Sequence, residues 1–385
     1  MKKRYDIVGS FLRPDQLLKA RKLHSQGQIS DTDLRQVEDR AIRDLVQKQV
    51  DLGYGQVTDG EFRRTWWHLD FFWGLTGVEA VNRQRTAANF HLSEAEVKYQ
   101  ADSLDLVAKL SGDNHPFVED FIFLQDLLAD YEGVDAKLTL PSPARLYYDL
   151  TSTEAGLANV KRIYPTKEGL FQAIQSAYET VLEDLYQAGA RFLQFDDPIW
   201  ITLVDRERFE QIYAFRNEDF DQLAQSLAED FVQVNNSVLK GRPDDLVIST
   251  HNCRGNFRSQ WASQGAYDPI APYAFVQQDF DRQFLEYDTD RAGGFEALKD
   301  VPDTVDVVLG LITSKSADLE DPDAIIRRVE EASHYHPLDK LYLSPQCGFA
   351  STEEGNLLTE ADQWQKLTHS RDIARRIWSD ADHVH

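Results

Sequence analysis

The chain has few cysteines, no long apolar run and a shortage of basic residues. Two cysteines in 385 residues cannot form the disulfide framework that stabilises small secreted domains. No apolar stretch approaches the roughly 20 residues of a membrane-spanning helix. The basic start, Met1-Lys-Lys-Arg, is followed by no apolar segment, so we expect no signal peptide. These absences predict a cytoplasmic protein that does not enter a membrane.

The charge balance excludes two classes of partner. The chain has 41 lysines and arginines against 65 acidic residues, a net charge of −24. DNA, RNA and anionic membranes are bound by basic surfaces, so we expect no nucleic-acid and no membrane partner. Hydrophobic residues make up 42% of the chain, enough for a large folded core at this length. We interpret most of the excess negative charge as a solubilising surface.

A unit of amphipathic helix, Gly or Pro break and short apolar strand recurs along the chain. Alternation of strands and helices predicts parallel βαβ units, and eight such units indicate an α/β fold of the (β/α)8 TIM barrel class. An open doubly wound sheet is the alternative, but the first strand is followed by Gly9-Ser-Phe-Leu-Arg-Pro14 and not by a G-x-G-x-x-G turn. We expect one catalytic domain over residues 1–385, with strands near 5–9, 56–59, 136–140, 191–195, 246–250, 283–287, 306–312 and 340–344.

One stretch does not fit a simple repeat. Residues 62–132, after the second predicted strand, are too many for one return helix. We therefore expect an insertion there, with a helical hairpin.

The conspicuous polar residues fall where the predicted strands end. Active sites of these barrels lie at the carboxyl ends of the strands, so side chains far apart in the sequence share one rim. The residues concerned are Ser10, Glu61, Asp196, His251, Cys253, Glu286, Lys315 and Cys347.

Four of these residues have side chains that bind metals. His251, Cys253, Glu286 and Cys347 offer an imidazole, two thiolates and a carboxylate, a set that suits Zn2+. They are spread over three strand ends, which favours an active site over a structural zinc knuckle. The spacing alone equally allows two buried cysteines acting as small hydrophobes, a capping histidine and a glutamate in a salt bridge.

Several segments resemble one enzyme family. His251-Asn-Cys253, Glu286 in Phe-Leu-Glu-Tyr-Asp and Cys347 in Ser-Pro-Gln-Cys-Gly-Phe are similar to the zinc motifs of cobalamin-independent methionine synthase. Ile7-Val-Gly-Ser-Phe-Leu-Arg-Pro14 resembles the substrate loop of that family's catalytic barrel. Asp59-Gly-Glu61 and Phe195-Asp-Asp-Pro198 resemble two further motifs, and all matches are collinear.

The resemblance implies a zinc-dependent transfer of a methyl group to the thiol of homocysteine. Zinc would bind the thiol and lower its pKa so that a thiolate exists near neutral pH. The resemblance assigns Ser10, Glu61 and Asp196 to the substrate amino acid. Two acidic side chains suit its ammonium group, and a hydroxyl with backbone N–H groups suits its carboxylate.

Two departures from the family concern the methyl donor. The family's two-barrel enzymes use a second barrel to hold folate, and this chain has the length of one. Methylfolate, a corrinoid protein and a methylated thiol or sulfonium compound therefore all stay open as donors. The family's proposed proton donor is a histidine, whereas the comparable stretch here is Ile312-Thr-Ser-Lys315-Ser, so Lys315 is a candidate for catalysis or for anchoring an anion.

Aromatic and basic residues follow directly on Glu61. Arg63, Arg64, Trp66 and Trp67 are candidates for binding the donor, although the same residues could pack an insertion core or pair with surface acids.

Two other functions stay open. One is a metal-free enzyme resembling the porphyrinogen decarboxylases. The other is a non-catalytic protein that binds zinc and a thiol.

Overall fold

The computed structural model describes residues 3–84 and 100–379. Its main sheet has seven parallel strands in the order β1-β4-β5-β6-β7-β8-β9. All but the first of the eight predicted strands coincide with a strand of this sheet. The strands are β1 (Gln56–Val57), β4 (Asp135–Pro141), β5 (Phe192–Asp196), β6 (Val247–Asn252), β7 (Arg282–Glu286), β8 (Asp306–Ile312) and β9 (Leu341–Pro345).

The predicted first strand is present as a short pairing beside β9. Tyr5 forms a parallel bridge with Leu343, and the Asp6 N–H donates to the Leu343 carbonyl at 3.0 Å. On the other side, the Thr58 hydroxyl donates to the Gly9 carbonyl at 2.6 Å. The N-terminal segment thus contacts both β9 and the segment after β1, the two edges of the curled sheet. The fold is an α/β fold consistent with a TIM-like barrel.

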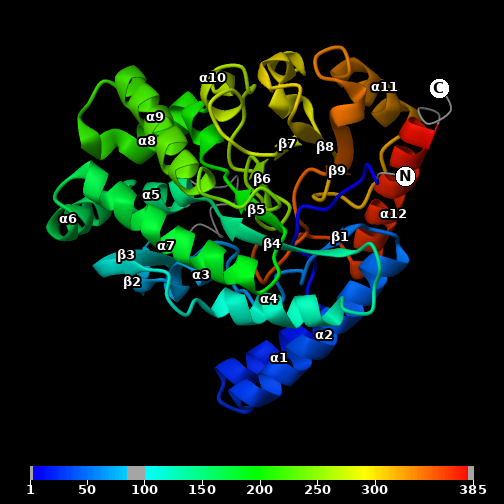
Figure 1. Ribbon diagram of the computed structural model, residues 1–385, viewed down its shortest axis with the longest axis horizontal. Helices are drawn as coiled ribbons and strands as arrows, with labels where there is room; N and C mark the ends of the chain where they lie inside the picture. The colour runs from blue at the N-terminus through cyan, green and yellow to red at the C-terminus, as the bar shows by residue number, and fades with distance from the viewer. Residues whose placement is uncertain (1–2, 85–99, 380–385) are drawn as a thin grey trace.

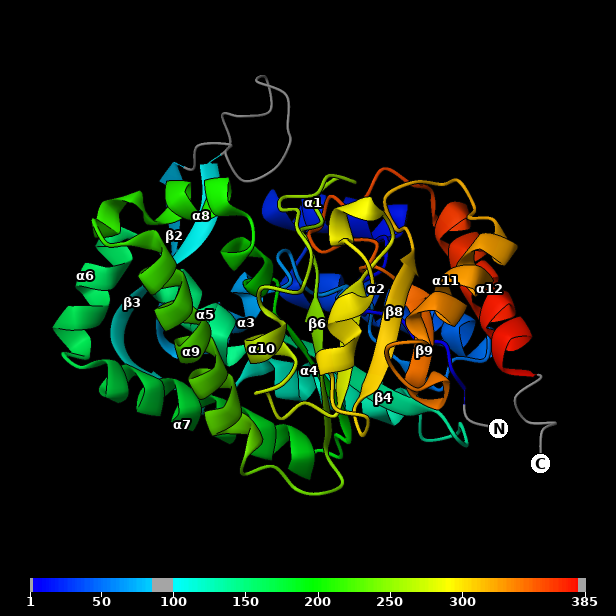
Figure 2. The same ribbon diagram turned by 90° about the horizontal axis from the view of Figure 1, so that it is seen from above.

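Helices surround the sheet (Figure 1, Figure 2). Their apolar faces and one face of the strands form a single large core, whereas Val8, Phe284, Val308 and Tyr342 form a small separate cluster. The longer helices are α1 (Asp15–Ser25), α2 (Asp31–Asp51), α4 (Pro116–Leu127), α5 (Pro143–Thr151), α6 (Glu154–Ile163), α7 (Lys167–Gln187), α8 (Arg206–Tyr213), α9 (Phe220–Leu239), α11 (Pro322–Ala332) and α12 (Glu360–Ser379).

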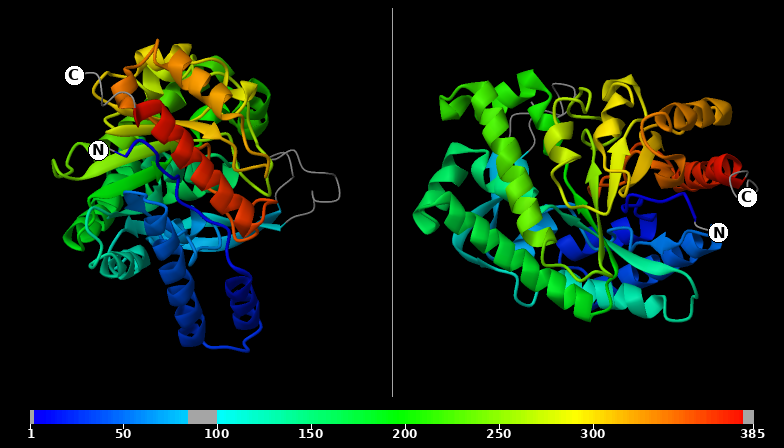
Figure 3. Two further views of the ribbon diagram at one scale, coloured as in Figure 1. Left: turned by 90° about the vertical axis from the view of Figure 1, so that its right-hand side faces the viewer. Right: turned by 45° about the horizontal axis from the view of Figure 1, so that its top comes forward.

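The helices begin where local sequence favours them. Ser30 caps α2 in a reciprocal capping box with Asp33, and Asp219 caps α9. The shorter elements are α3 (Leu69–Gly74), α10 (Ala271–Ala274) and the 3-10 turns η1 (Trp200–Leu203), η2 (Ala214–Arg216), η3 (Asp290–Ala292), η4 (Glu296–Asp300) and η5 (Leu338–Lys340). The two helices α1 and α2 pair with each other and project from the body (Figure 3).

The stretch 62–132 differs from our expectation. Its described residues contain an antiparallel β pair, β2 (Thr76–Gln84) and β3 (Gln100–Ser111), between α3 and α4. The prediction of a helical hairpin is therefore wrong for this part of the chain. Alternation in Leu104-Asp-Leu106 has the period of a strand, with Leu104 and Leu106 buried. The expected stretch also includes 85–99, which lie outside the described residues.

The helices are too short or too polar to span a membrane, among the residues that the structure describes.

Candidate metal centre and cavity

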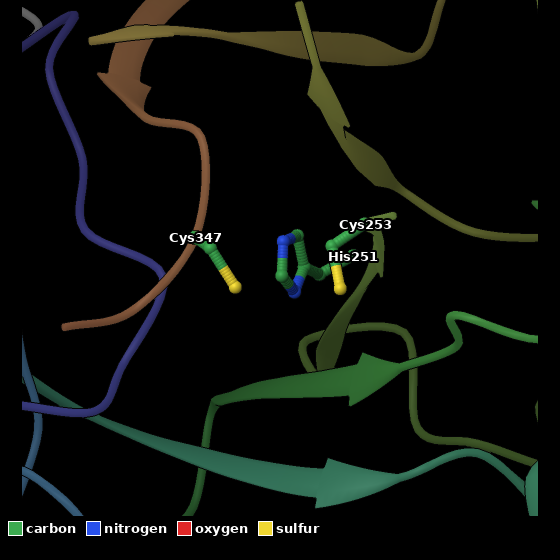
Figure 4. A group of neighbouring side chains, drawn as sticks. All are labelled: His251, Cys253 and Cys347. Carbon is green, nitrogen blue, oxygen red and sulfur yellow. The ribbon is translucent and has the colours of Figure 1, made fainter. Parts of the chain in front are cut away.

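Three predicted metal ligands lie together at the carboxyl ends of the strands. His251 is the second-last residue of β6, Cys253 directly follows that strand, and Cys347 follows β9. One ligand atom from each lies within 4.8 Å of the others, and all three residues are buried (Figure 4). Around a tetrahedral zinc, thiolate and imidazole ligand atoms are separated by roughly 3.5–4 Å. The donor set and its size therefore fit Zn2+.

His251 is oriented by a carboxylate from the neighbouring strand. Its Nδ1 lies 2.9 Å from Asp196 Oδ1, and its Nε2 lies 3.2 Å from the Gln346 carbonyl. A carboxylate on one ring nitrogen fixes the tautomer that presents the other nitrogen to a metal. In the metal-free protein, burial opposes protonation of His251, but the bond to Asp196 and the neighbouring Cys253 outweigh it and raise its pKa to about 9.

The two thiols have different proton affinities. A hydrogen bond from Cys347 outweighs the effect of burial and lowers the pKa of Cys253 to about 7. The same bond and burial raise the pKa of Cys347 well above its usual value. The pair therefore favours one thiolate, Cys253, and one thiol, Cys347. Binding of a metal by both sulfurs must displace the proton of the thiol.

Glu286, the fourth predicted ligand, lies near this cluster but outside it. It ends β7 and is fully buried. Its Oε2 accepts a 2.8 Å bond from the Arg254 N–H, and its Oε1 lies 3.5 Å from Arg291 Nη2. Its negative charge opposes ionisation of both cysteines, although the net pKa of Cys253 is still lowered. The structure therefore brings together three of the four residues and holds the fourth by protein contacts.

The three predicted substrate residues line one cavity with these ligands. Ser10, Glu61 and Asp196 share a cavity of about 180 Å³ with His251, Cys253 and Cys347. That volume is below the roughly 300–1,000 Å³ of pockets for drug-sized ligands, so the cavity suits a small molecule.

Glu61 has an unusual environment within the cavity. Its backbone is left-handed, with φ 60°, and its Oε1 accepts a 2.7 Å bond from the Thr139 hydroxyl. Arg64 Nη1 lies 3.6 Å from the same oxygen. Burial nevertheless raises the pKa of Glu61 to about 7. A buried carboxyl of this kind gains strongly from a cationic ligand.

The four predicted donor residues separate into two groups. Trp66 and Trp67 line the cavity. Arg63 does not line it; its guanidinium contacts Glu38 and Asp39 of α2 and Asp120 of α4. Arg64 is also not among the lining residues; it donates to the Thr139 hydroxyl and carbonyl at 3.1 and 2.8 Å. The arginines consequently support the rim, and the tryptophans face the cavity.

Lys315 lies in a neighbouring groove and is not among the residues that line the cavity. That groove also contains Ser259, Asp288 and Arg291. The positive charge of Lys315 opposes the rise in the pKa of Cys347, so it lies within electrostatic range of the thiol.

Several cavity residues carry no motif that singles them out in the sequence. His68, Arg145, Tyr148 and Arg208 line the cavity. Each lies in the segment that follows a strand, between 4 and 12 residues after the strand ends, and this position is the signal that could have found them. Arg13, within the N-terminal motif, instead joins the rim loops, with four guanidinium bonds of 2.7–3.2 Å to the carbonyls of Glu61, Arg64, Ala350 and Thr352.

The fold and the cavity together define an α/β enzyme with a TIM-like sheet and a cluster of metal-binding side chains at its rim. The family model described as the cobalamin-independent synthase catalytic domain matches residues 159–375. The chain therefore belongs to this family, whose members are methyltransferases. This membership favours the synthase interpretation over the alternative that resembles the porphyrinogen decarboxylases.

Individual relatives span nearly the whole chain. The uncharacterized proteins YxjH and YxjG of Bacillus subtilis are each 41% identical, covering 97% of this chain and 94% of their own. A methionine synthase of Saccharolobus solfataricus is 22% identical over 94% of this chain and 90% of its own.

Solved structures agree with this result. A chain of Listeria monocytogenes, assigned as a vitamin-B12-independent methionine synthase, has a TM-score of 0.73 at 34% identity and covers 97% of this chain and 98% of its own. A B12-independent methionine synthase of a Shewanella strain has a TM-score of 0.70 at 18% identity, with full coverage of both chains, and supports the fold alone.

Proposed function

We propose that the protein is a zinc-dependent S-methyltransferase that transfers a methyl group to the thiol of homocysteine. The observation that carries the proposal is the shared cavity: the His251, Cys253 and Cys347 cluster opens onto the same small space as Glu61 and Asp196. A thiol-binding metal and two acidic side chains in one small cavity suit an amino acid whose side chain ends in sulfur.

Different residues bind the zinc and the two ends of the substrate. His251, Cys253 and Cys347 would hold the zinc, and Glu286 would become the fourth ligand by leaving the Arg254 N–H. Bound zinc lowers the pKa of a coordinated thiol. Glu61 and Asp196 contact the ammonium group of the substrate, and Ser10 contacts its carboxylate. Fixing both ends of a short amino acid orients its sulfur toward the remaining part of the cavity.

The remaining part of the cavity receives the methyl donor. Trp66 and Trp67 offer flat apolar surfaces to this donor. Arg64, which lies beside the Glu61 carboxylate and does not line the cavity, holds Glu61 in position. Methylfolate is one donor and a corrinoid protein is another. Lys315 supports the Cys347 thiolate electrostatically from the neighbouring groove.

We infer that residues 1–385 act as one catalytic domain. The pairing of residues 4–6 with β9 and the contact of Gly9 with Thr58 support closure of the seven-stranded sheet into a (β/α)8 barrel, with the stretch after β1 inserted over its side. Two free cysteines at a metal centre suit the reducing cytoplasm, where we place the enzyme.

The test is metal content and methyl transfer on the same preparations. Wild type should contain about one zinc per chain, and Cys253→Ser should contain almost none. Wild type should also form methionine from homocysteine with one of the candidate donors, and the variant should not. Absence of zinc from the wild-type protein would contradict the proposal. Zinc and homocysteine binding without product would instead support the non-catalytic alternative.

A further inference from the structure

The cavity contains one imidazole that the proposed function does not use. His68 lies between β1 and α3, is 7% exposed, and lines the cavity with Glu61, Cys253 and Cys347. It lies beyond the metal-binding cluster, since that cluster contains only His251, Cys253 and Cys347 among the described residues. An imidazole is a side chain that can donate or accept a proton in a reaction.

The surroundings of His68 hold its ring in place. The ring packs against Trp67 with centroids 4.6 Å apart and meets Phe72 edge-on at 6.1 Å. Its Nε2 faces Asp149 Oδ2 at 3.9 Å. Asp149 is itself fixed by two bonds from Arg145, of 2.8 and 2.9 Å. Stacking restricts the ring, and an adjacent carboxylate stabilises a positive charge on it.

The other charged groups at the cavity have different tasks or cannot donate a proton. Arg145 and Arg208 are permanently charged guanidiniums. Glu61 and Asp196 are assigned to the substrate ammonium. Lys315 lies in the neighbouring groove with Asp288 and Arg291, so it does not reach the cavity in this structure. His68 is therefore the best-placed proton donor on the side where Trp66 and Trp67 receive the donor.

We propose that His68 protonates the leaving nitrogen of an amine-type methyl donor. The inference rests on the proposed function. The thiolate sulfur of the substrate gives an electron pair to the methyl carbon, and the carbon–nitrogen bond breaks with its pair left on nitrogen. That nitrogen takes the proton of the His68 imidazolium. The products are a thioether, an N–H amine and a neutral imidazole, which solvent reprotonates.

The experiment compares two donors that differ in their need for a proton. 5-Methyltetrahydrofolate leaves as an amine that must be protonated, whereas S-methylmethionine leaves as a neutral thioether. Zinc-loaded full-length wild type, His68→Gln and His68→Asn are assayed with both donors. Zinc content and calorimetric binding of homocysteine are measured on every variant, and they should not change. His369→Gln removes a part-buried imidazole on α12, outside the cavity, and is the matched control.

The expected result is a loss specific to one donor. With 5-methyltetrahydrofolate the His68 variants should lose about 100- to 10,000-fold in kcat, the usual contribution of a general acid. With S-methylmethionine they should stay within about twofold of wild type. Lys315→Gln, measured in parallel, should show no such selectivity.

Four outcomes would overturn the inference. Equal losses with both donors would show a structural role for His68. A donor-specific loss in Lys315→Gln and not in the His68 variants would transfer the role to Lys315. Wild type that uses only S-methylmethionine would show that no acid is needed, although the proposed methyl transfer would stand. Wild type that binds zinc and homocysteine but uses neither of these donors would overturn the inference, and the proposed function would fail only if a methylated corrinoid were also not used.

Discussion

Glu286 differs from the other residues of the metal centre in its contacts. Its carboxylate accepts from the Arg254 N–H and faces Arg291, whereas the cysteines contact each other and His251. A ligand that has protein partners in the metal-free state can exchange between them and the metal. Catalytic zinc sites keep a position of this kind for the substrate.

This contrast gives the first prediction. Glu286→Gln keeps an acceptor for Arg254 and removes a charge, so we expect zinc to stay bound with reduced affinity. Cys347→Ser, which removes a thiolate, should lose far more. Titration of each variant with a competing chelator measures the two affinities. If Glu286→Gln loses zinc as completely as Cys347→Ser, the glutamate is an obligatory ligand.

Glu61 gives a prediction on pH. Burial raises its pKa to about 7, so the carboxylate form dominates only above that pH. An ammonium group binds the carboxylate and not the neutral acid. We therefore expect homocysteine affinity to fall as the pH decreases through 7, by up to about tenfold per pH unit.

Calorimetry between pH 5.5 and 8.5 tests this dependence. Glu61→Gln is the control, because any pH dependence that remains in it belongs to the metal centre and the thiol. Identical profiles for wild type and variant would show that Glu61 does not bind the ammonium group.

At the scale of elements, the site depends on loops that interlock above the strands. Arg13 connects the loop after β1 to the loop after β9 through backbone carbonyls. The Trp67 N–H donates to the Ser351 carbonyl at 3.0 Å, and the Phe349 N–H donates to the Ser10 carbonyl at 2.9 Å. Metal ligand, substrate residues and tryptophans are thus fixed to one another by contacts between loops.

Gly348 is where this packing is tightest. A Cβ at this position would lie 2.0 Å from Ser10 Oγ, far inside contact distance. Gly348→Ala should therefore displace Ser10 and the adjacent Cys347, lowering both zinc affinity and the melting temperature. Gly241→Ala is the matched control, since its Cβ would meet nothing within 4 Å.

Measurement of zinc binding and thermal unfolding decides this prediction. Adding Ser10→Gly to Gly348→Ala should recover zinc binding, because it removes the clashing hydroxyl. Wild-type behaviour of Gly348→Ala alone would mean that the loops are not as rigid as the packing indicates.

At the scale of the whole molecule, we expect folding not to depend on the metal. The large core extends over the helices and strands far from the rim. We therefore expect chelation to abolish methyl transfer while the protein stays folded. Zinc should stabilise the protein only by the linkage of ligand binding. At a zinc concentration 100 times its Kd, this linkage raises the free energy of unfolding by about 2.7 kcal/mol, and the melting temperature rises accordingly.

Circular dichroism and activity before and after chelation, followed by return of zinc, check this expectation. Recovery of activity on adding zinc is part of the expected result. Unfolding of the chelated protein would show that the centre is structural, in contrast to the active site that we propose.

The sequence by itself determined the strands, the helices that separate them and the residues at the strand ends. Apolar periodicity is local, so it could be recognised without a structure. Seven of the eight predicted strands are strands of the main sheet, and the first is a short pairing beside β9. The motifs containing His251, Cys253 and Cys347 predicted a cluster that the structure contains. The alternation in Leu104-Asp-Leu106 of β3 is also local, but we expected a helical hairpin in this stretch, which was wrong.

Only the tertiary structure decided which rim residues share the cavity. Arg63 and Trp66 are three residues apart in the sequence. Arg63 nevertheless pairs with Asp39 of α2, whereas Trp66 lines the cavity. Asp196 and His251 meet because β5 and β6 pair in register, and Lys315 lies in a different groove. Loop conformation and contacts with distant segments set the direction of a side chain, and neither is encoded in the local pattern that identifies a strand.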